Sequence, residues 1–162
     1  MTVRGAQKAA EAGAAAIVVS NHGGRVLDQT PATAEVLEEI VQAVGSRLTI
    51  LVDGGIRSGV DVFKALALGA DGVLIARPFV TAVYGGGQAG VQAYVDQLAA
   101  ELADTMVMCG AHSIRELSRD MVRRFPEERY LRFASGRRSL RPPGAIFQAY
   151  SNCYSTQPRN VV

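Results

Sequence analysis

The sequence predicts an α/β fold built from parallel β–α–β units. Three short apolar runs, over 14–20, 48–52 and 72–75, have the continuous hydrophobicity of strands that are buried on both faces. Segments with helical periodicity precede and separate these runs, and this alternation is typical of a parallel sheet with crossover helices. The spacing of the runs suits either a (β/α)8 barrel or a doubly wound sheet, and three strands are too few to close a barrel.

The predicted helices are bounded by the usual start and stop signals. Residues 1–13 are rich in alanine and end at Gly13, while Ser58 is placed as an N-cap and Gly69 as a stop. The stretch from Tyr84 through the three glycines that follow it is expected to be a flexible connector ahead of a long helix. We predict helices over 1–13, 31–44, 59–68, 88–108 and 113–124.

The composition is that of a globular chain. Of the 162 residues, 48% are hydrophobic and 20% are charged, which suffices for one domain with a core. No apolar run is long enough to span a membrane. The two cysteines, Cys109 and Cys153, are too few and too far apart to indicate a disulfide framework or a zinc site. We therefore expect a cytoplasmic protein without a metal.

Charge divides the chain into two parts. Residues 1–118 carry 8 Lys and Arg against 12 Asp and Glu, whereas residues 119–162 carry 9 against 3. Periodicity ends near Phe125, so we expect one α/β unit over 1–124 and an irregular basic tail over 125–162. The tail contains no dense run of basic residues, and we do not expect it to bind nucleic acid.

A candidate phosphate site follows the second and third predicted strands. The segment DGGIR, over 53–57, combines glycines whose amides an anion can approach closely with an arginine fork that suits phosphate. The N-terminus of the helix after this segment would add a positive dipole. Arg77 follows the next strand, and parallel strands place their carboxyl ends at one edge of the sheet. Arg57 and Arg77 are therefore expected to reach the same anion, although tight turns with solvated arginines would give the same pattern.

The loop after the first predicted strand, SNHGGR over 20–25, has residue types suited to acid–base chemistry. His22 titrates near neutral pH, so it can accept a proton from a substrate hydroxyl or carbon. Arg25 can bind a carboxylate through its planar fork, and the pair suits an acid that carries a hydroxyl group. A histidine in a glycine-rich surface loop also occurs without a catalytic role, so both interpretations stay open at this point.

At these loops the sequence resembles the FMN-dependent α-hydroxy-acid dehydrogenases and oxidases, the family of glycolate oxidase, lactate oxidase and the flavocytochrome b2 dehydrogenase domain. The resemblance extends from about Thr2 to Leu117. It is carried by IVVSNHGGRVLDQTPAT (17–33), VDGGIRSGVDVFKALALGA (52–70), ARPF (76–79) and LADTMVMCG (102–110). The combination of SNHGGR with DGGIR at this spacing is specific, because other FMN barrels usually lack the histidine loop.

The resemblance implies the C-terminal part of a (β/α)8 TIM barrel, which this chain leaves incomplete. It implies FMN as cofactor and the oxidation of a small L-2-hydroxy acid, of the lactate or glycolate type, to the 2-oxo acid. His22 is implied to be the catalytic base, taking a proton from either the hydroxyl or the α-carbon, and to bind the substrate together with Arg25. The residues implied to bind the cofactor are Ser20, Asp53, Gly54, Gly55, Ile56, Arg57, Ala76 and Arg77.

The sequence departs from the family pattern in two respects. Ala76 stands where the family usually has glycine, which adds one methyl group near the phosphate site. The earlier strands, which in the family supply a lysine near the flavin and a carboxylate partner for the histidine, have no counterpart here. We therefore expect a truncated member that acts as a homo-oligomer or with an N-terminal half. The alternatives are a non-redox phosphate-binding TIM-barrel fragment and a non-catalytic assembly partner.

Overall fold

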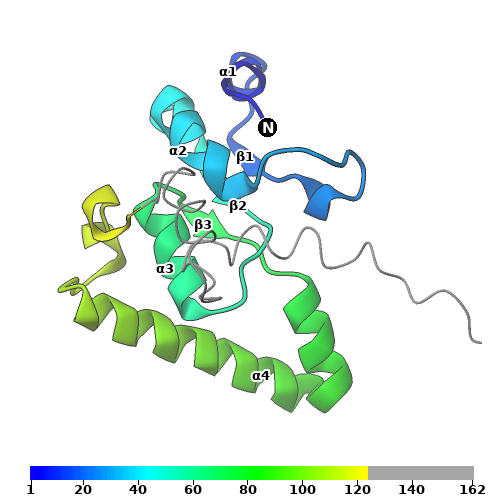
Figure 1. Ribbon diagram of the computed structural model, residues 1–162, viewed down its shortest axis with the longest axis vertical. Helices are drawn as coiled ribbons and strands as arrows, with labels where there is room; N and C mark the ends of the chain where they lie inside the picture. The colour runs from blue at the N-terminus through cyan, green and yellow to red at the C-terminus, as the bar shows by residue number, and fades with distance from the viewer. Residues whose placement is uncertain (124–162) are drawn as a thin grey trace, which may run out of the picture.

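The fold is built on a small parallel sheet. A computed structural model describes residues 1–123, so the predicted basic tail and its boundary at residue 124 lie outside the described residues (Figure 1). The strands are β1 (Ala16–Val19), β2 (Thr49–Val52) and β3 (Gly72–Val73), in the spatial order β1-β2-β3. Their register pairs Ala16 with Thr49 and Leu51 with Gly72. All three predicted strands are confirmed.

Two of the helices begin at side-chain caps. The Thr2 hydroxyl accepts a hydrogen bond from the Gly5 amide at 3.1 Å, and the Ser58 hydroxyl accepts one from the Asp61 amide at 3.2 Å. The helices are α1 (Val3–Glu11), α2 (Thr33–Val44), α3 (Gly59–Ala67) and α4 (Arg77–Met108), with 3-10 turns η1 (His22–Gly24), η2 (Ile114–Glu116) and η3 (Arg119–Met121).

The order of the strands is compatible with both topologies that their spacing allowed. The strands lie side by side in chain order. Because crossover connections between parallel strands are right-handed, a steady progression in one direction places α2 and α3 on the same face of the sheet. This one-sided arrangement occurs in an arc of a (β/α)8 barrel and also in one half of a doubly wound sheet.

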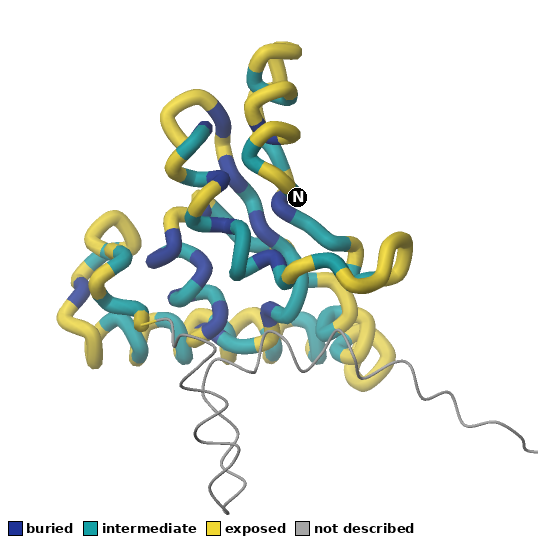
Figure 2. Tube along the Cα trace, turned by 45° about the horizontal axis from the view of Figure 1, so that its top comes forward, coloured by how far each residue is buried: buried dark blue, intermediate teal, exposed yellow. Residues whose placement is uncertain are grey.

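The core lies between this helix-covered face and the helices. Val19, Ile50 and Val52 are at most 3% exposed and pack in one cluster with residues of α2 such as Leu37 and Ile40. Figure 2 shows the buried parts of the chain in dark blue at the centre of the molecule, with exposed segments around them. Side chains alternate between the two faces of a strand. On the opposite face Val18 is 46% and Leu74 is 43% exposed. The prediction of strands buried on both faces is therefore wrong for these two residues. Their face of the sheet is apolar, but no layer within residues 1–123 covers it.

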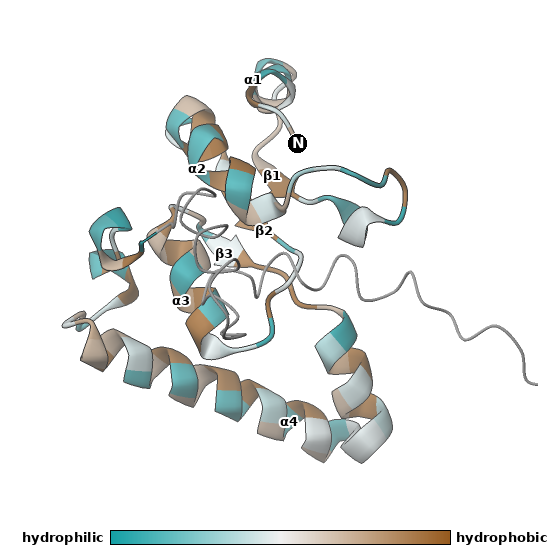
Figure 3. Cartoon of the chain, viewed as in Figure 1, coloured by the Kyte–Doolittle hydropathy of each residue, from teal (hydrophilic) through white to brown (hydrophobic). Residues whose placement is uncertain are grey.

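Helix α4 replaces the predicted connector. Residues 77–86, including Tyr84, are helical, and the helix is interrupted only at Gly87, where φ is 54° and ψ is −135°. This conformation is open essentially to glycine alone, so the third glycine provides a sharp bend and the first two continue the helix. Hydrophobic and hydrophilic residues alternate along α4 (Figure 3). Neither α4 nor any other helix of residues 1–123 is long and apolar enough to cross a membrane.

The predicted helix over 113–124 is wrong, because the segment forms the two short turns η2 and η3 instead. The Glu116 carboxylate accepts hydrogen bonds from the His112 amide at 2.9 Å and the Ser113 hydroxyl at 3.0 Å, which closes the first turn on itself. These bonds hold the pKa of Glu116 below its usual value, the His112 amide contributing most. Leu117 is then extended, with φ −65° and ψ 124°, so the chain leaves the helical conformation.

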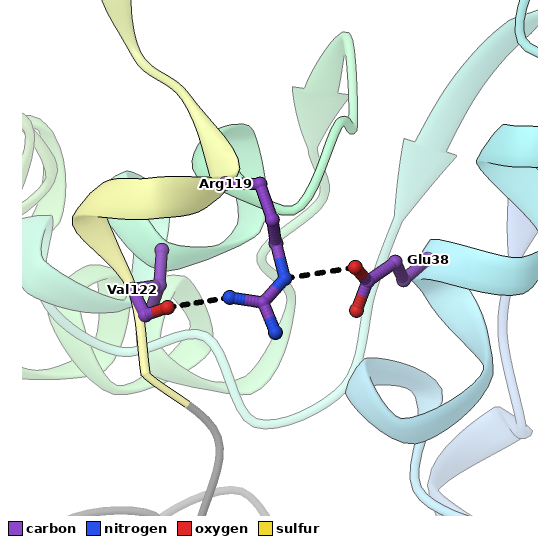
Figure 4. Close-up of polar contacts among 3 residues, drawn as sticks. All are labelled: Glu38, Arg119 and Val122. Atoms are coloured by element: carbon purple, nitrogen blue, oxygen red, sulfur yellow. Dashed lines mark hydrogen bonds and ion pairs between the residues drawn. The ribbon is translucent and has the colours of Figure 1, made fainter.

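Arg119 fixes this terminal segment to α2. Its Nε lies 2.8 Å from Oε1 of Glu38, and its Nη1 donates to the Val122 carbonyl (Figure 4). Because both side chains are partly exposed, we expect Arg119→Ala to lower the free energy of unfolding by about 1 kcal/mol, measured by urea denaturation. The exposed Arg115, in η2, supplies the control, since Arg115→Ala is expected to change stability by less than about 0.5 kcal/mol. Equal losses in the two variants would show that the ion pair contributes nothing.

Candidate functional site

The loops that follow the three strands meet at the carboxyl edge of the sheet. The Ser20 hydroxyl, directly after β1, donates a hydrogen bond of 2.8 Å to Oδ2 of Asp53, directly after β2. The buried Thr33 hydroxyl, in the first turn of α2, donates to the Asp53 carbonyl at 2.7 Å. Asp53 is therefore held from both sides, and the first two loops form one unit. The parallel register predicts this meeting, whereas nothing in the sequence pattern singles out Thr33 as its support.

The side-chain oxygen Oδ1 of Asp53 gives the clearest indication that a ligand binds here. Oδ1 is buried and has no hydrogen-bond partner within residues 1–123, although Oδ2 is satisfied by Ser20. A buried acceptor without a donor costs on the order of 1–3 kcal/mol, and natural proteins rarely leave one unexplained. The position of this oxygen, next to the turn that begins at Gly54, fits a bound molecule that donates a hydroxyl or amide hydrogen.

The backbone after Asp53 forms a turn that a ligand can approach closely. Gly54 and Gly55 have φ values of 85° and 82°, in the left-handed region that favours glycine. A Cβ at Gly54 would lie 3.4 Å from the Thr33 hydroxyl oxygen, so a side chain would also crowd the support of Asp53. Within residues 1–123 the amides of Gly54, Gly55 and Ile56 donate no hydrogen bond. The Ile56 side chain is 3% exposed in the core, so only its backbone can serve a ligand.

The first backbone amides of α3 already have acceptors within the chain. The Gly59 amide donates to Oε2 of Glu101 at 2.8 Å, and the amides of Arg57 and Ser58 donate to Oδ2 of Asp61 at 3.1 and 3.2 Å. Two carboxylates thus cap this helix end internally. The sequence shows Asp61 as part of the capping box, but Glu101 comes from α4 and only the tertiary structure brings it here. Helix α4 begins at Arg77 itself, so its positive end also lies at the site.

Arg57 and Arg77 line one cavity, as predicted. Its other walls are Pro78, Thr81, Ala82 and Tyr94, all of α4. The Tyr94 hydroxyl donates to the Arg57 carbonyl at 2.8 Å, and its ring meets the Phe79 ring edge-on at 4.9 Å. Partial burial raises the pKa of the Tyr94 hydroxyl above its usual value, and the Glu101 carboxylate raises it further, so the hydroxyl stays a donor at neutral pH.

The histidine loop, residues 20–25, lies beside the cavity that Arg57 and Arg77 line, here called the cationic cavity. His22 has a φ of 54°, unusual for a residue other than glycine, and its amide donates to the Ser20 hydroxyl oxygen at 3.1 Å. The Asn21 side chain accepts a hydrogen bond from the Gly23 amide at 3.0 Å, which closes the turn. A Cβ built on Gly23 would lie 3.4 Å from Nη2 of Arg77, so the Arg77 guanidinium reaches the histidine loop.

The structure therefore brings most of the predicted site residues together, but not all. Ser20 bonds to Asp53, Arg57 and Arg77 line one cavity, and Ala76 immediately precedes Arg77. His22 also lines a second cavity, with Ser20, Asn21 and the apolar side chains of Val26 and Leu27 among its walls. The Arg25 side chain is exposed and makes no hydrogen bond or ion pair within residues 1–123. Asn21, Thr33 and Tyr94 are the supporting residues that sequence reasoning missed.

A parallel sheet with helices on one face, and two arginines that follow its second and third strands and line one cavity, defines the class of parallel α/β proteins. Comparison with known proteins makes the assignment specific. The family model for FMN-dependent dehydrogenase matches residues 1–124, and the chain belongs to this family. The predicted family and its (β/α)8 fold are thereby confirmed, and the non-redox alternative is not favoured.

The relatives that the chain resembles are hydroxy-acid oxidases. Peroxisomal (S)-2-hydroxyacid oxidase GLO3 of Arabidopsis thaliana is 50% identical over 123 residues, which are 76% of this chain and 34% of that protein. Glycolate oxidase of Spinacia oleracea is 47% identical over 122 residues, 75% of this chain and 33% of that protein. A crystal structure of mandelate oxidase with benzoyl-formic acid gives a TM-score of 0.71 at 49% identity, covering 74% of this chain and 36% of that one. The chain thus spans about a third of the length of the curated relatives it matches.

Proposed function

We propose that this chain supplies the FMN-binding edge and the catalytic histidine of an FMN-dependent 2-hydroxy-acid oxidoreductase. The observation that carries this proposal is the buried, partnerless Oδ1 of Asp53, beside a glycine turn and a cavity with two arginines. FMN is a ligand with both of the complementary groups, a chain of hydroxyls and a terminal phosphate. Membership of the FMN-dependent dehydrogenase family supports the same choice.

The residues present fit the ribityl and phosphate end of FMN. Asp53 would accept a hydrogen bond from a ribityl hydroxyl through Oδ1, while Ser20 holds Oδ2 in place. The amides of Gly54, Gly55 and Ile56, which donate to no acceptor within residues 1–123, would be available to the ligand. Arg57 and Arg77 would neutralise the phosphate from two sides of their cavity, with Ala76 at the start of the helix beside it.

The proposed reaction is the oxidation of a small L-2-hydroxy acid to the 2-oxo acid. When bound, FMN supplies the two-electron acceptor for this chemistry. His22 would accept the proton that the substrate loses, since the loop around Asn21 and Ser20 presents it beside the cationic cavity. Arg25, which is exposed on the same loop, would bind the substrate carboxylate. The (S)-2-hydroxyacid and glycolate oxidases among the relatives support this substrate class.

Titration of the purified chain with FMN tests the proposal. We expect saturation near one equivalent, with quenching of flavin fluorescence and a shifted visible spectrum, because the phosphate-binding residues all lie on this chain. Anaerobic addition of lactate or glycolate to the loaded protein should then bleach the flavin absorbance, and His22→Gln should abolish the bleaching while FMN stays bound. A folded, monodisperse chain that takes up no FMN would refute the proposal.

We further propose that the open sheet pairs with the remaining strands of a barrel, contributed by further polypeptide or by a second copy of this chain. The support is the exposed apolar face at Val18 and Leu74 and the outer edge of β1, which pairs with no further strand among residues 1–123. Sedimentation analysis separates the two sources. A dimer or larger oligomer at micromolar concentration indicates self-association, and a monomer that binds a hydrophobic dye indicates that further strands are needed. A monomer that binds no dye would contradict both.

A further inference from the structure

Tyr94 connects its own part of α4 to two other segments that line the cationic cavity. It lies in the part of α4 after the bend at Gly87, and its hydroxyl bonds to the Arg57 carbonyl in the loop after β2. Its ring contacts Phe79, in the part of α4 before the bend, two residues after Arg77. One side chain thus touches a residue close to each arginine and also lines the cavity between them.

The contact between Phe79 and Tyr94 matters because α4 bends between these two residues, at Gly87. Within residues 1–123 no atom lies within 4 Å of a Cβ built on Gly85, Gly86 or Gly87. The later part of α4 is fixed on α3, where Gly59 meets the backbone of Leu98 and Leu102. The two parts of α4 meet at Gly90, where an added Cβ would lie 2.3 Å from the Ala82 carbonyl oxygen. The Phe79–Tyr94 contact adds a side-chain connection closer to Arg77.

We propose that Tyr94 is a positioning residue that sets the separation of Arg57 and Arg77 so that both address one phosphate group. The hydroxyl fixes the loop that carries Arg57, and the ring fixes the helix start that carries Arg77. This inference rests on the proposed function, because it takes the phosphate of FMN as the shared ligand. A purely structural role of Tyr94 would affect the binding of the whole ligand. The positioning role instead predicts weaker binding of the phosphate end and unchanged binding of the rest.

Tyr94→Phe removes the hydroxyl and keeps the ring against Phe79, so the variant tests the hydrogen bond alone. A neutral hydrogen bond contributes about 1 kcal/mol, so we expect FMN to bind roughly fivefold more weakly. Riboflavin, which lacks the phosphate, should bind both proteins equally. Tyr84→Phe is the matched control, because Tyr84 lies on the same helix with 89% of its surface exposed, and it should leave both affinities unchanged.

Hydrogen exchange provides a second measurement that needs no ligand. In Tyr94→Phe the amides of residues 57–59, which donate to the Asp61 and Glu101 carboxylates, should exchange faster than in the wild type, while those of β1 and β2 keep their rates. Equal FMN affinity in Tyr94→Phe and wild type, or an equal loss for FMN and riboflavin, would overturn the inference. If the wild-type chain binds no FMN, the proposed function fails separately. Unchanged exchange at 57–59 in the variant would then refute the positioning role as well, and faster exchange would support it.

Discussion

Replacing Gly59 by alanine is expected to separate α3 from α4 and to cost about 3 kcal/mol or more of unfolding free energy. A Cβ at this position would lie 2.2 Å from the Leu102 amide nitrogen and 2.5 Å from the Leu98 carbonyl oxygen. Both are backbone atoms, so no rotamer change can relieve the overlap. The helices would have to move apart, and the bond from the Gly59 amide to Glu101 would be lost with the contact. Urea denaturation followed by circular dichroism measures the change.

Gly85→Ala is the matched control for this prediction. Gly85 lies within α4 in open space, so its added methyl group meets nothing and removes a helix-breaking glycine. We expect its stability to be unchanged or raised by up to about 1 kcal/mol. A Gly59→Ala chain as stable as the wild type would show that α3 and α4 do not pack as closely as the structure has them.

Replacing Arg57 or Arg77 by alanine is expected to weaken FMN binding by about tenfold to a hundredfold each. Both guanidinium groups line one cavity, and a hydrogen bond to a charged group contributes about 1.5–3 kcal/mol. Because the two would bind the same phosphate, the losses in the double variant should not be additive. Lysine should restore only part of the affinity at either position, since an ammonium group lacks the planar fork. Fluorescence titration with FMN measures these changes.

Arg47 provides the control for charge. It is exposed and precedes β2, so it lies at the opposite end of the strand from Asp53, and Arg47→Ala changes the net charge as the site variants do. We expect its FMN affinity to match the wild type. Similar losses in all three single variants would indicate that FMN responds to the overall charge of the chain, and would contradict a defined phosphate site.

Local sequence signals predict the elements well where one segment determines its own structure. The Ser58 cap, the stops at Gly13 and Gly69, and the apolar runs of β1 and β2 are all where the sequence places them. The site is predictable for a related reason. Parallel strands place every carboxyl end at one edge of the sheet, so Asp53 and Arg77 are both expected at that edge once the strands are identified.

The errors lie where distant segments decide the outcome. Glu101 occupies the N-terminus of α3 from the far part of α4, so a helix end that looks open in the sequence is capped in the structure. The three glycines after Tyr84 suggested a flexible connector, but only Gly87 leaves the helical conformation. The exposed apolar face at Val18 could not be anticipated, because a run of apolar residues carries no information about whether a second layer is present.

The Oδ1 atom of Asp53, which has no partner within residues 1–123, favours ligand binding but lowers the stability of the unliganded chain. A carboxylate kept half-satisfied in a buried position lowers the stability of the unliganded chain, and a ligand that donates to it would recover that stability on binding. Selection of variants for heat resistance alone, without FMN, would therefore favour apolar replacements at this residue and discard the site. Selection in the presence of FMN would retain it, so the conditions of any directed-evolution experiment on this chain determine which of the two properties survives.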